Sequence, residues 1–567
     1  MKLTPILIAM LPALAVTASQ AAVFQVVELG AAEGYKSSFA AAINNSNQSV
    51  GTNSNQFNFP VDVNAVDYTN SLITTNLTAA EIEEVKKGNV NAKALGVLIG
   101  YLKNNVSGYT VQRFADAFAV RLDTKQRVML RETSQAPTNY EYLVGINEQN
   151  QLLGYGTAPF TQQSFTPAAT TAVPAPVAVK VWVPAPGYQL GVVVTQGKAH
   201  ALPPLYTDLG GGFSLPRDIN NNGQVIGSGS VAVPEKTQTS VKTLCDGKAE
   251  PVQLCYYRQA IAGTMYTSAA LLWQLDANGK PGTAVKVPYL GDKNTGLPHS
   301  KTEYSEVNYY SQLQEINDQG VIVGSSVFTD SGDIRFSPLT YRDEVFTTMK
   351  AVHIVDNKVE SFINQSEWES NNATGINNKN IIVGSARKLW YQGPDRFFVY
   401  DMAAKKLTFP TDLFATANTI PEAINDNNIV VGTTEAFTTG SSTRRNIGFM
   451  YDIATDKFTD LNTLLPCNSG YSIVNAMGIN DKNVIVATAV KAVDKRDIKG
   501  DIVKDSNGVV VKEEIAIAVQ LNPVAGGVAD NCSKPEDTNY ERKGGAGGWL
   551  SLCLLPLLLL RRKMTKA

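Results

Sequence analysis

The stretch Pro421-Glu-Ala-Ile424-Asn425-Asp426-Asn427-Asn428-Ile429-Val430-Val431-Gly432 contains the nine-residue phrase that decides the fold of this chain. An apolar residue ends one strand, four turn-forming residues follow, and a β-branched run begins the next strand. An Asn or Asp side chain at the first turn position can accept hydrogen bonds from backbone amides ahead of it. The fourth turn position needs a left-handed backbone, because type I hairpin turns usually continue into such a residue. The phrase therefore predicts a β-hairpin.

This phrase occurs seven times, and the copies start at Ile43, Ile146, Ile219, Ile316, Ile376, Ile424 and Ile479. The fourth turn positions are Asn47, Asn150, Gly223, Gly320, Asn380, Asn428 and Asn483. All are Gly or Asn, the residues that adopt a left-handed backbone at least cost. The phrase ends in Gly51, Gly154, Gly227, Gly324, Gly384 and Gly432, and in Ala487 in the seventh copy. A strand position without a side chain predicts close approach of the backbones there.

Each hairpin has further strands beside it in the sequence. An aromatic or apolar strand that often ends in Asp is expected at residues 117–123, 269–276, 397–401 and 449–452. A short turn then leads to a strand ending in Asp-Leu or a similar pair, expected at residues 205–210, 411–413 and 458–462. One unit therefore contains about four strands, as a propeller blade does.

The two ends of the repeat region give the topology. The seventh hairpin is followed by its apolar strand at residues 515–521, but the strand that should come next is missing. Residues 24–30, FQVVELG, have the pattern of that missing strand. A ring gains from this arrangement, because the first strand completes the last blade and leaves no open edge. We therefore expect an all-β fold, a seven-bladed β-propeller over residues 22–523 closed by its N-terminal strand, with two packed β-sandwiches as the rival.

A helical insertion is expected in the first blade, at about residues 77–104. Thr78 and Glu81 have the spacing of a capping box, and Leu95, Leu98 and Leu102 follow helical spacing. Such an insertion either carries function or covers an apolar edge. Two non-helical insertions are also expected: an extended loop at residues 166–176 and a charged, solvated hairpin at 494–514 with a turn at 505–508.

The composition and the N-terminus indicate an exported protein that does not bind nucleic acid. The chain has 49 Lys and Arg against 51 Asp and Glu, and phosphate contacts need concentrated positive charge. Residues 1–21 resemble a secretory signal peptide, with Lys2, an apolar run at residues 6–16 and small residues up to Ala21. Signal peptidase is expected to cleave after Ala21 or Ala22.

Five cysteines suit an oxidising compartment. Cys245 and Cys255 flank a turn-rich stretch, and we expect a disulfide between them. By elimination, Cys467 pairs with Cys532, which leaves Cys553 in the C-terminal apolar run.

The C-terminus contains a linker at residues 524–543 and a tail at 544–567. The tail has a cluster of glycines, Gly544, Gly545, Gly547 and Gly548, then a short apolar segment at 549–560, then Arg561, Arg562 and Lys563. The apolar run is shorter than the roughly 20 residues of an ordinary membrane span, so it would cross only a thinned bilayer, with the basic residues in the cytoplasm. This order of features resembles the GlyGly-CTERM sorting signal of Gram-negative bacteria. The resemblance implies cleavage near the glycines by a rhomboid-type protease, a rhombosortase, and transfer to the cell surface; a simple membrane anchor is the alternative.

The repeats resemble HAF extracellular repeats, which combine a D-L-G strand with an I-N-x-x-G-x-V-V-G hairpin. The chain as a whole is similar to a proteobacterial family of uncharacterised exported proteins. The resemblance implies an exported protein that is tethered to the inner membrane as a precursor and then reaches the surface or the medium. It supplies no activity and no catalytic residues.

The sequence contains few residues that indicate chemistry. The three histidines, His200, His299 and His353, lie in different units, and no nucleophile elbow, P-loop or dinucleotide motif is present. Asp218, Asn220 and Asn222 match the first half of a calcium loop, but Gly229 occupies the position of the required Glu. The same pattern is explained by the hairpin turn. We expect no cofactor.

Two classes of function remain. The first is a binding or structural module at the cell surface, with a glycan or protein ligand. The second is an extracellular enzyme that acts on polymers, a glycan hydrolase or lyase, with its site at the central channel. Acidic residues recur in the Asp-Leu strands (Glu28, Asp208, Asp412 and Asp460), but their spread around the ring makes them structural first. An enzyme should gather several carboxylates or a His in one central pocket.

Overall fold

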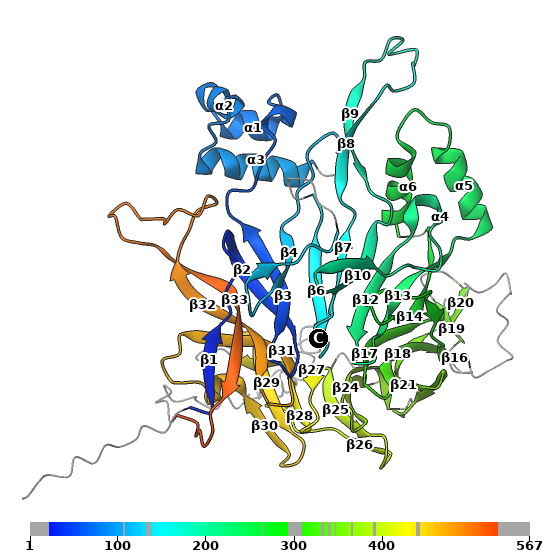
Figure 1. Ribbon diagram of the computed structural model, residues 1–567, viewed down its shortest axis with the longest axis vertical. Coiled ribbons are helices and arrows are strands. Elements are labelled where there is room, and N and C mark those ends of the chain that lie inside the picture. The colour runs from blue at the N-terminus through cyan, green and yellow to red at the C-terminus, as the bar shows by residue number, and fades with distance from the viewer. Residues whose placement is uncertain are drawn as a thin grey trace, which may run out of the picture. The chain divides into compact units, whose positions relative to one another are not determined.

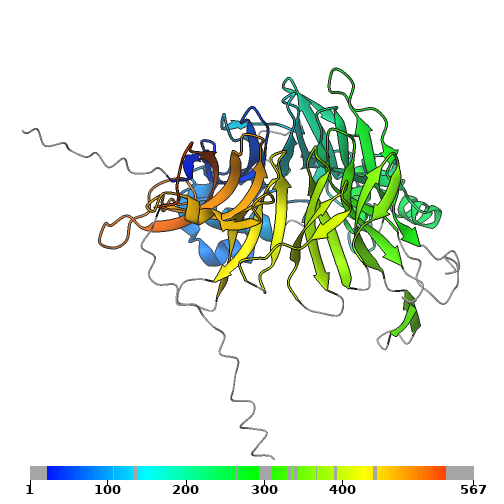
Figure 2. The same cartoon turned by 90° about the horizontal axis from the view of Figure 1, so that it is seen from below.

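A computed structural model describes residues 22–530, except 106–107, 132–137, 264, 293–308, 330–333, 338–341, 346, 365–366, 389–392, 415 and 438–442. Contacts divide the chain into a large unit, Met1–Ala436 with Arg445–Asp530, and a small unit, Phe437–Arg444 with Asn531–Ala567. The large unit contains a seven-bladed β-propeller (Figures 1 and 2). The predicted fold class is confirmed.

Each blade is an antiparallel sheet of about four strands. Blade 1 consists of β2 (Tyr35–Ile43), β3 (Ser49–Gln56), β4 (Ala117–Arg121) and β5 (Gln126–Arg127). Blade 2 consists of β6 (Glu141–Ile146), β7 (Leu152–Thr157), β10 (Gln189–Thr195) and β11 (Lys198–Ala201). Blade 3 consists of β12 (Ser214–Ile219), β13 (Gln224–Ala232), β14 (Thr267–Gln274) and β15 (Val285–Lys286). Blade 4 consists of β17 (Ser311–Ile316), β18 (Ile322–Thr329), β21 (Thr348–Val355) and β22 (Lys358–Ser361), with β16 (Gly291–Asp292) parallel to β18.

The last three blades follow the same order. Blade 5 consists of β23 (Trp368–Ile376), β24 (Ile381–Lys388), β25 (Arg396–Asp401) and β26 (Lys406–Thr408). Blade 6 consists of β27 (Thr419–Ile424), β28 (Ile429–Phe437), β29 (Arg444–Asp452) and β30 (Lys457–Asp460). Blade 7 consists of β31 (Tyr471–Ile479), β32 (Ile485–Asp494), β33 (Lys512–Pro523) and β1 (Phe24–Glu28).

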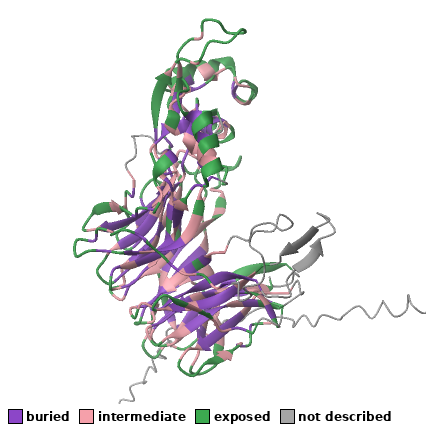
Figure 3. Ribbon diagram, turned by 90° about the vertical axis from the view of Figure 1, so that its right-hand side faces the viewer, coloured by how far each residue is buried: buried purple, intermediate pink, exposed green. Residues whose placement is uncertain are grey.

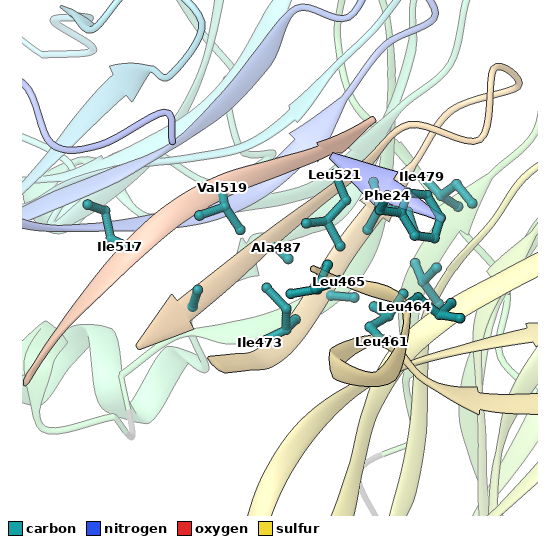
Figure 4. Packing of buried hydrophobic residues seen from close by; sticks show 14 residues of the cluster. Phe24, Leu461, Leu464, Leu465, Ile473, Ile479, Ala487, Ile517, Val519 and Leu521 are labelled. Carbon is teal, nitrogen blue, oxygen red and sulfur yellow. The ribbon is translucent and has the colours of Figure 1, made fainter. Parts of the chain in front are cut away.

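The N-terminal strand closes the ring as predicted. β1 pairs antiparallel with β33, with Val26 opposite Leu521 and Glu28 opposite Val519. Phe24 and Leu521 are buried in one apolar cluster with Ile473 and Leu461 (Figure 4). Leu461 belongs to η3 (Leu461–Leu464), which enters this blade from blade 6. The closing strand is therefore built into the core of blade 7.

The backbone at the seven turns follows the prediction. All seven residues at the fourth turn position have φ between +57° and +78°. The glycines at the end of the phrase face a carbonyl oxygen of the first strand; a Cβ on Gly384 would lie 2.1 Å from the oxygen of Asn372. The same clash, at 2.0 to 2.3 Å, would occur at the other five glycines. Close backbone approach is therefore the reason for glycine here.

Five blades carry an insertion between their second and third strands. These are η1 (Val63–Ala65) with α1 (Ser71–Asn76), α2 (Ala79–Lys86) and α3 (Ala92–Asn104) in blade 1; β8 (Phe160–Phe165) and β9 (Val179–Pro184) in blade 2; α5 (Glu235–Cys245) and α6 (Val252–Ile261) in blade 3; β19 (Ile334–Ser337) and β20 (Arg342–Val345) in blade 4; and residues 495–511 in blade 7. Each second strand starts at an Ile-Asn turn. The insertions therefore leave from the end of the blade away from those turns. Figure 3 shows that buried residues concentrate in the blades and exposed ones at the insertions.

The helical insertion of blade 1 is confirmed, including its capping box. Thr78 accepts a hydrogen bond from the amide of Glu81, whose carboxylate accepts one from the amide of Thr78. The helices have their own apolar core, which also includes Ile498 from the blade 7 insertion. That insertion was expected to be solvated. The expectation is wrong for Ile498 and for Lys499, whose Nζ donates to the carbonyl of Val90.

Two expected Asp-Leu strands are not strands. Residues 205–210 lead into the short turn α4 (Asp208–Gly211), where Leu209 and the next three glycines have positive φ. Residues 411–413 follow β26 without pairing, and Asp412 instead binds Arg396 at 2.8 Å. The Asp-Leu pattern marks the connection between blades here, whereas at 458–462 it coincides with β30 and η3. The α5–α6 pair and the β8–β9 hairpin were not predicted.

Candidate functional site: the central channel

The seven Ile-Asn turns meet at the centre of the ring and form a closed circle of hydrogen bonds. The first Asn of each turn donates from Nδ2 to the backbone carbonyl of the equivalent Asn in the next blade, at 2.9 to 3.1 Å; these residues are Asn44, Asn147, Asn220, Asn317, Asn377, Asn425 and Asn480. Each Oδ1 accepts from the amide four residues ahead in its own turn. The side chains are buried. This inner ring is structural, because every member makes the same bonds.

A second closed circle, here called the rim ring, is formed by the next residue of each turn. Its members are Asn45, Glu148, Asn221, Asp318, Asn378, Asp426 and Asp481. Each backbone amide donates to a side-chain oxygen of the next member, at 2.7 to 2.9 Å. Amide and acidic side chains alternate around the ring, so that Asn221, for example, also donates from Nδ2 to Asp318. Seven is odd, and two acids, Asp426 and Asp481, are therefore neighbours.

The channel wall next to these rings is built by a β-bulge in the first strand of every blade. The register shifts two residues before the Ile-Asn pair in each of the seven strands, and β23 and β31 have a second shift nearer their start. The bulged residues all line the channel: Ala41, Val144, Arg217, Gln314, Thr374, Glu422 and Met477. A bulge redirects a side chain, and bulges are frequent beside functional sites. The channel has a volume of about 350 Å³.

The bulged residues differ in chemistry on the two sides of the channel. Blades 7, 1 and 2 contribute the apolar Met477, Ala41 and Val144, which form an apolar arc. Blades 3 to 6 contribute Arg217, Gln314, Thr374 and Glu422, which form a polar arc. The hydrogen-bonded rings repeat seven times, but this layer does not. The departure from the repeat is what distinguishes a candidate ligand site from the framework.

Two further carboxylates lie next to the polar arc. Asp218 accepts a hydrogen bond from the amide of Ile316 at 2.9 Å, and Glu315 accepts one from the amide of Ile376 at 2.8 Å. Each acid therefore binds the next blade. Desolvation raises the pKa of Asp218, and it raises the pKa of Glu315 well above its usual range, with repulsion from Asp218 adding to it.

Three side chains of the polar arc, those of Arg217, Gln314 and Glu422, make no hydrogen bond to the residues that the structure describes, whereas Thr374 donates to the carbonyl of Pro421. Arg217 has no carboxylate of the described residues within 4 Å. Burial raises the pKa of Glu422, and attraction to Arg217 offsets part of this rise. Arg217 also attracts Asp218 and Glu315. Besides the four acids of the rim ring, the channel thus holds one guanidinium and three carboxylates, here called the inner carboxylates: Asp218, Glu315 and Glu422.

Comparison with family models assigns the chain to a protein family. A family model for proteins of unknown function, DUF3466, matches residues 2–563. The chain belongs to the DUF3466 family. No curated protein sequence is similar to it at a significant level.

Solved structures resemble the DUF3466 chain only distantly. A protein of unknown function from Dyadobacter fermentans has 10% identity and a TM-score of 0.32, covering 68% of this chain and 94% of that one. An oligogalacturonate lyase from Vibrio parahaemolyticus has 8% identity and a TM-score of 0.34, covering 73% and 85%. The β-propeller domain of the Trilobed protease from Pyrococcus furiosus has 10% identity and a TM-score of 0.27, covering 66% and 97%.

The DUF3466 structure places the calcium candidates in the turn of blade 3. Asn220 Oδ1 accepts hydrogen bonds from the amides of Asn222 and Gln224, and Asn222 Nδ2 donates to the carbonyl of Asp318. Asp218 binds the amide of Ile316. A calcium ion would have to displace these bonds, so the turn accounts for all three residues. No three His, Cys, Asp or Glu side chains within the described ranges converge as metal ligands.

The remaining predicted site residues have separate outcomes. Cys245 and Cys255 form the predicted disulfide, which joins the end of α5 to α6 and closes the short turn between them. This disulfide indicates an oxidising, extracellular-type environment. Ala21, Cys532 and the glycines 544, 545, 547 and 548 lie outside the described residues, as does the apolar segment 549–560. None of the helices in the described ranges has the length and apolarity of a membrane span.

Sequence reasoning missed the residues of the channel wall in this DUF3466 protein. The acids of the Asp-Leu segments, Glu28, Asp208, Asp412 and Asp460, do not line the channel. The signal was nevertheless present. Two residues before each Ile-Asn pair, the seven copies carry side chains as different as Ala41, Arg217 and Glu422, within an otherwise uniform phrase.

Proposed function

We propose that this protein is an exported binding module whose ligand enters the central channel at the Ile-Asn turns. The observation that carries the proposal is the polar arc, which interrupts a seven-fold repeat with four different polar side chains in consecutive blades. A purely structural channel would repeat, as the two rings do. The predicted signal peptide and sorting tail support a location at the cell surface or in the medium, after a membrane-tethered stage.

The ligand that fits this wall best is a sugar unit of a glycan. The volume of about 350 Å³ lies at the lower end of small-ligand pockets. The wall offers N–H donors from Arg217 and acceptors from Glu422 on one side, with apolar surface from Val144 and Met477 opposite. Sugar hydroxyls both donate and accept hydrogen bonds, and the carbon face of a sugar ring packs on apolar side chains. A large protein surface could not enter the channel.

An enzyme that acts on polymers is the second candidate, because carboxylates with raised pKa values do gather in the channel. Glycoside hydrolysis generally needs a pair of carboxyl groups free to act as acid and as base or nucleophile. Asp218 and Glu315 each accept a backbone amide of the next blade, which leaves Glu422 as the inner carboxylate without such a bond. A binding site needs no pair of free carboxyl groups. Binding therefore explains the residues of the channel wall more simply than catalysis does.

The test is a binding screen of the purified protein against a glycan array, combined with variants that fill the channel from its apolar side. Ala41→Phe and Val144→Phe leave the polar arc unchanged, and each should abolish binding of whatever glycan is retained. Ala403→Phe, at an exposed position after β25, is the matched control and should bind as the wild type does. Thermal melting verifies that each variant folds.

Two results would contradict the proposal. Undiminished binding by both folded channel variants would place the site elsewhere. Cleavage of the retained glycan by the wild type, but not by Glu422→Gln, would favour the enzyme. For the predicted location, deletion from Gly544 should shift the protein between membrane, periplasm and medium, and so should loss of the host rhomboid protease. An unchanged distribution would contradict the sorting signal.

A further inference from the structure

A separate pocket lies where blade 7 meets blade 1, on the side of the ring that carries the insertions. It has a volume of about 220 Å³ and shares no lining residue with the central channel. Its walls come from three parts of the chain: the outer ends of β2 and β3, the helix α3, and the blade 7 insertion at residues 495–511. This pocket, here called the junction pocket, is therefore built from both ends of the ring.

Direct bonds hold the walls of the junction pocket together. The amide of Asn58, just after β3, donates to the carbonyl of Ile498 in the blade 7 insertion at 2.8 Å. Lys36 Nζ, on β2, pairs with Glu513 of β33 at 2.6 Å. A pocket whose walls are already fixed binds a ligand without the cost of ordering them.

The most buried lining residues of the junction pocket are apolar. Ile99 of α3 and Phe114 are buried, and Phe57 and Ile498 are half-buried. An apolar cavity of about 150 Å³ is large enough to hold a benzene ring. The junction pocket therefore has room for an aromatic ring or a short aliphatic chain that carries one polar group.

Each wall of the junction pocket also contributes a basic residue: Lys36 from blade 1, Lys103 from α3 and Arg496 from the blade 7 insertion. Lys103 and Arg496 are exposed, which places them at the mouth of the pocket. Lys103 Nζ lies 4.6 Å from the centre of the Phe114 ring, so its charge is held above an apolar lining residue.

The two cations at the mouth lack a close counter-charge. No Asp or Glu among the described residues lies within 4 Å of Lys103 or Arg496. Arg496 Nη1 donates to the carbonyl of Gly500 at 2.6 Å, which orients the guanidinium. Its remaining N–H groups make no hydrogen bond to the described part of the chain and are available to a ligand.

The two acids of the lining are engaged by backbone amides. Asp116 accepts from the amide of Gln56 at 3.0 Å and attracts Lys103 only from a longer distance. Asp497 Oδ1 accepts from the amides of Lys499 and Asp501, which closes a turn of the insertion. The groups that remain for a ligand are therefore the cations at the mouth and the apolar side chains.

We propose that the junction pocket binds a small organic acid, a carboxylate attached to an aromatic ring or a short apolar chain. The apolar part packs on Ile99 and Phe114, and the carboxylate accepts charge-assisted hydrogen bonds from Lys103 and Arg496. This second site is independent of the channel and goes beyond the proposed function. Because α3 and the blade 7 insertion both contact the ligand, binding also joins the two ends of the ring.

The experiment is calorimetric titration of the purified protein with phenylacetate, phenylacetamide, phenethylamine and acetate. The amide keeps the ring but removes the charge, and acetate keeps the charge but removes the ring. Phenylacetate should bind on the order of ten-fold more tightly than the amide, the size expected for hydrogen bonds between charged groups, and also more tightly than acetate. Phenethylamine, which carries the opposite charge, should bind more weakly than the amide.

Variants at the mouth of the junction pocket test the two cations. Lys103→Gln combined with Arg496→Gln should remove the preference for phenylacetate over the amide, because both positions are exposed and only the charges are lost. Lys495→Gln, exposed in the same insertion and outside the pocket, is the matched control and should retain the preference. Phenylacetate should raise the melting temperature of the wild type and of the control, but not of the double variant, because a ligand that binds the folded state stabilises it.

Four results would overturn the inference. They are equal binding of phenylacetate and phenylacetamide, tighter binding of phenethylamine, an undiminished preference in the folded double variant, and absence of binding by all four probes. Val144→Phe, which fills the central channel, separates the two sites. Unchanged phenylacetate binding by this variant supports the junction pocket, whereas loss of binding would place the acid in the channel.

Discussion

Asn480 Nδ2 donates a hydrogen bond of 2.9 Å to the backbone carbonyl of Asn44, which lies 436 residues earlier in the chain. This bond closes the inner ring of seven Asn residues. The pairing of β1 with β33 closes the propeller at the outer edge of blade 7. Chain closure is therefore achieved twice, once by a strand and once by side chains at the channel.

Asn480→Ala should strongly lower the stability of the propeller. The substitution leaves the buried carbonyl of Asn44 without its donor and removes the acceptor for the amides of Lys482 and Val484. A lost buried hydrogen bond that leaves its partner unsatisfied costs about 1–3 kcal/mol, and loss of a turn cap adds to it. Thermal melting measures the effect. Lys482→Ala, in the same turn but exposed, is the control; a similar loss there would show that the inner ring is not responsible.

Gly384→Ala should be among the most damaging single-methyl additions in the chain. The new Cβ would lie 2.1 Å from the carbonyl oxygen of Asn372 and 2.8 Å from Cα of Ala373, so blade 5 would have to separate. Overpacking of this kind costs roughly 1–3 kcal/mol and sometimes more. The seventh repeat already carries Ala487 at this position, and Ala487→Gly is therefore the matched control, with an expected change of about 1 kcal/mol or less. Comparable melting temperatures for Gly384→Ala and the wild type would contradict the steric explanation.

Much of the framework could be predicted because it depends on local backbone rules. Asn428 and Gly223, at the fourth turn position, indicate a left-handed backbone without any knowledge of the rest of the fold. The sequence around Val26 likewise has the pattern of the missing outer strand. The positions of Arg217 and Glu422 depend instead on a bulge. A bulge is set by the pairing of two strands and by the carbonyl that faces Gly227 or Gly432, so no local pattern within one copy reveals it.

The missed elements have other physical reasons. The helix α5 reads EKTQTSVKTLC, with Val241 and Cys245 as its buried residues, too few for a helical period to stand out. The expected strand at residues 205–210 fails because Leu209, Gly210 and Gly211 take positive φ, which extended strands do not allow. An aromatic residue followed by Thr-Asp-Leu can begin a turn as readily as it ends a strand.

Reduction of the Cys245–Cys255 disulfide should loosen the α5–α6 pair without opening the blades. The two helices are short, and their contacts to the blade involve a limited apolar cluster with Val233 and Met265. A disulfide that closes a small loop contributes about 2–3 kcal/mol. Cys245→Ser with Cys255→Ser should therefore speed amide hydrogen exchange in α5 and α6, while exchange in β13 and β14 stays slow. Thr243→Ser is the control. Uniformly faster exchange over all blades would contradict a local role.

Glu422→Gln should stabilise the protein at neutral pH, because burial of the ionised Glu422 carboxylate in the channel lowers the free energy of unfolding. Burial raises the pKa of Glu422 in the folded state above its usual value of 4.5. A carboxyl group with a raised folded pKa binds more protons in the folded state than in the unfolded state, so its contribution to stability falls as the pH rises through that pKa. The amide side chain that replaces the carboxyl group does not titrate and has no such dependence. The melting temperature of Glu422→Gln should therefore exceed that of the wild type at pH 7.5, and the two should agree at pH 4, below the pKa in both states. Glu33→Gln, whose side chain is exposed, should match the wild type at both values. An advantage of equal size at pH 4 and pH 7.5 would show that packing, and not the charge of Glu422, sets the difference.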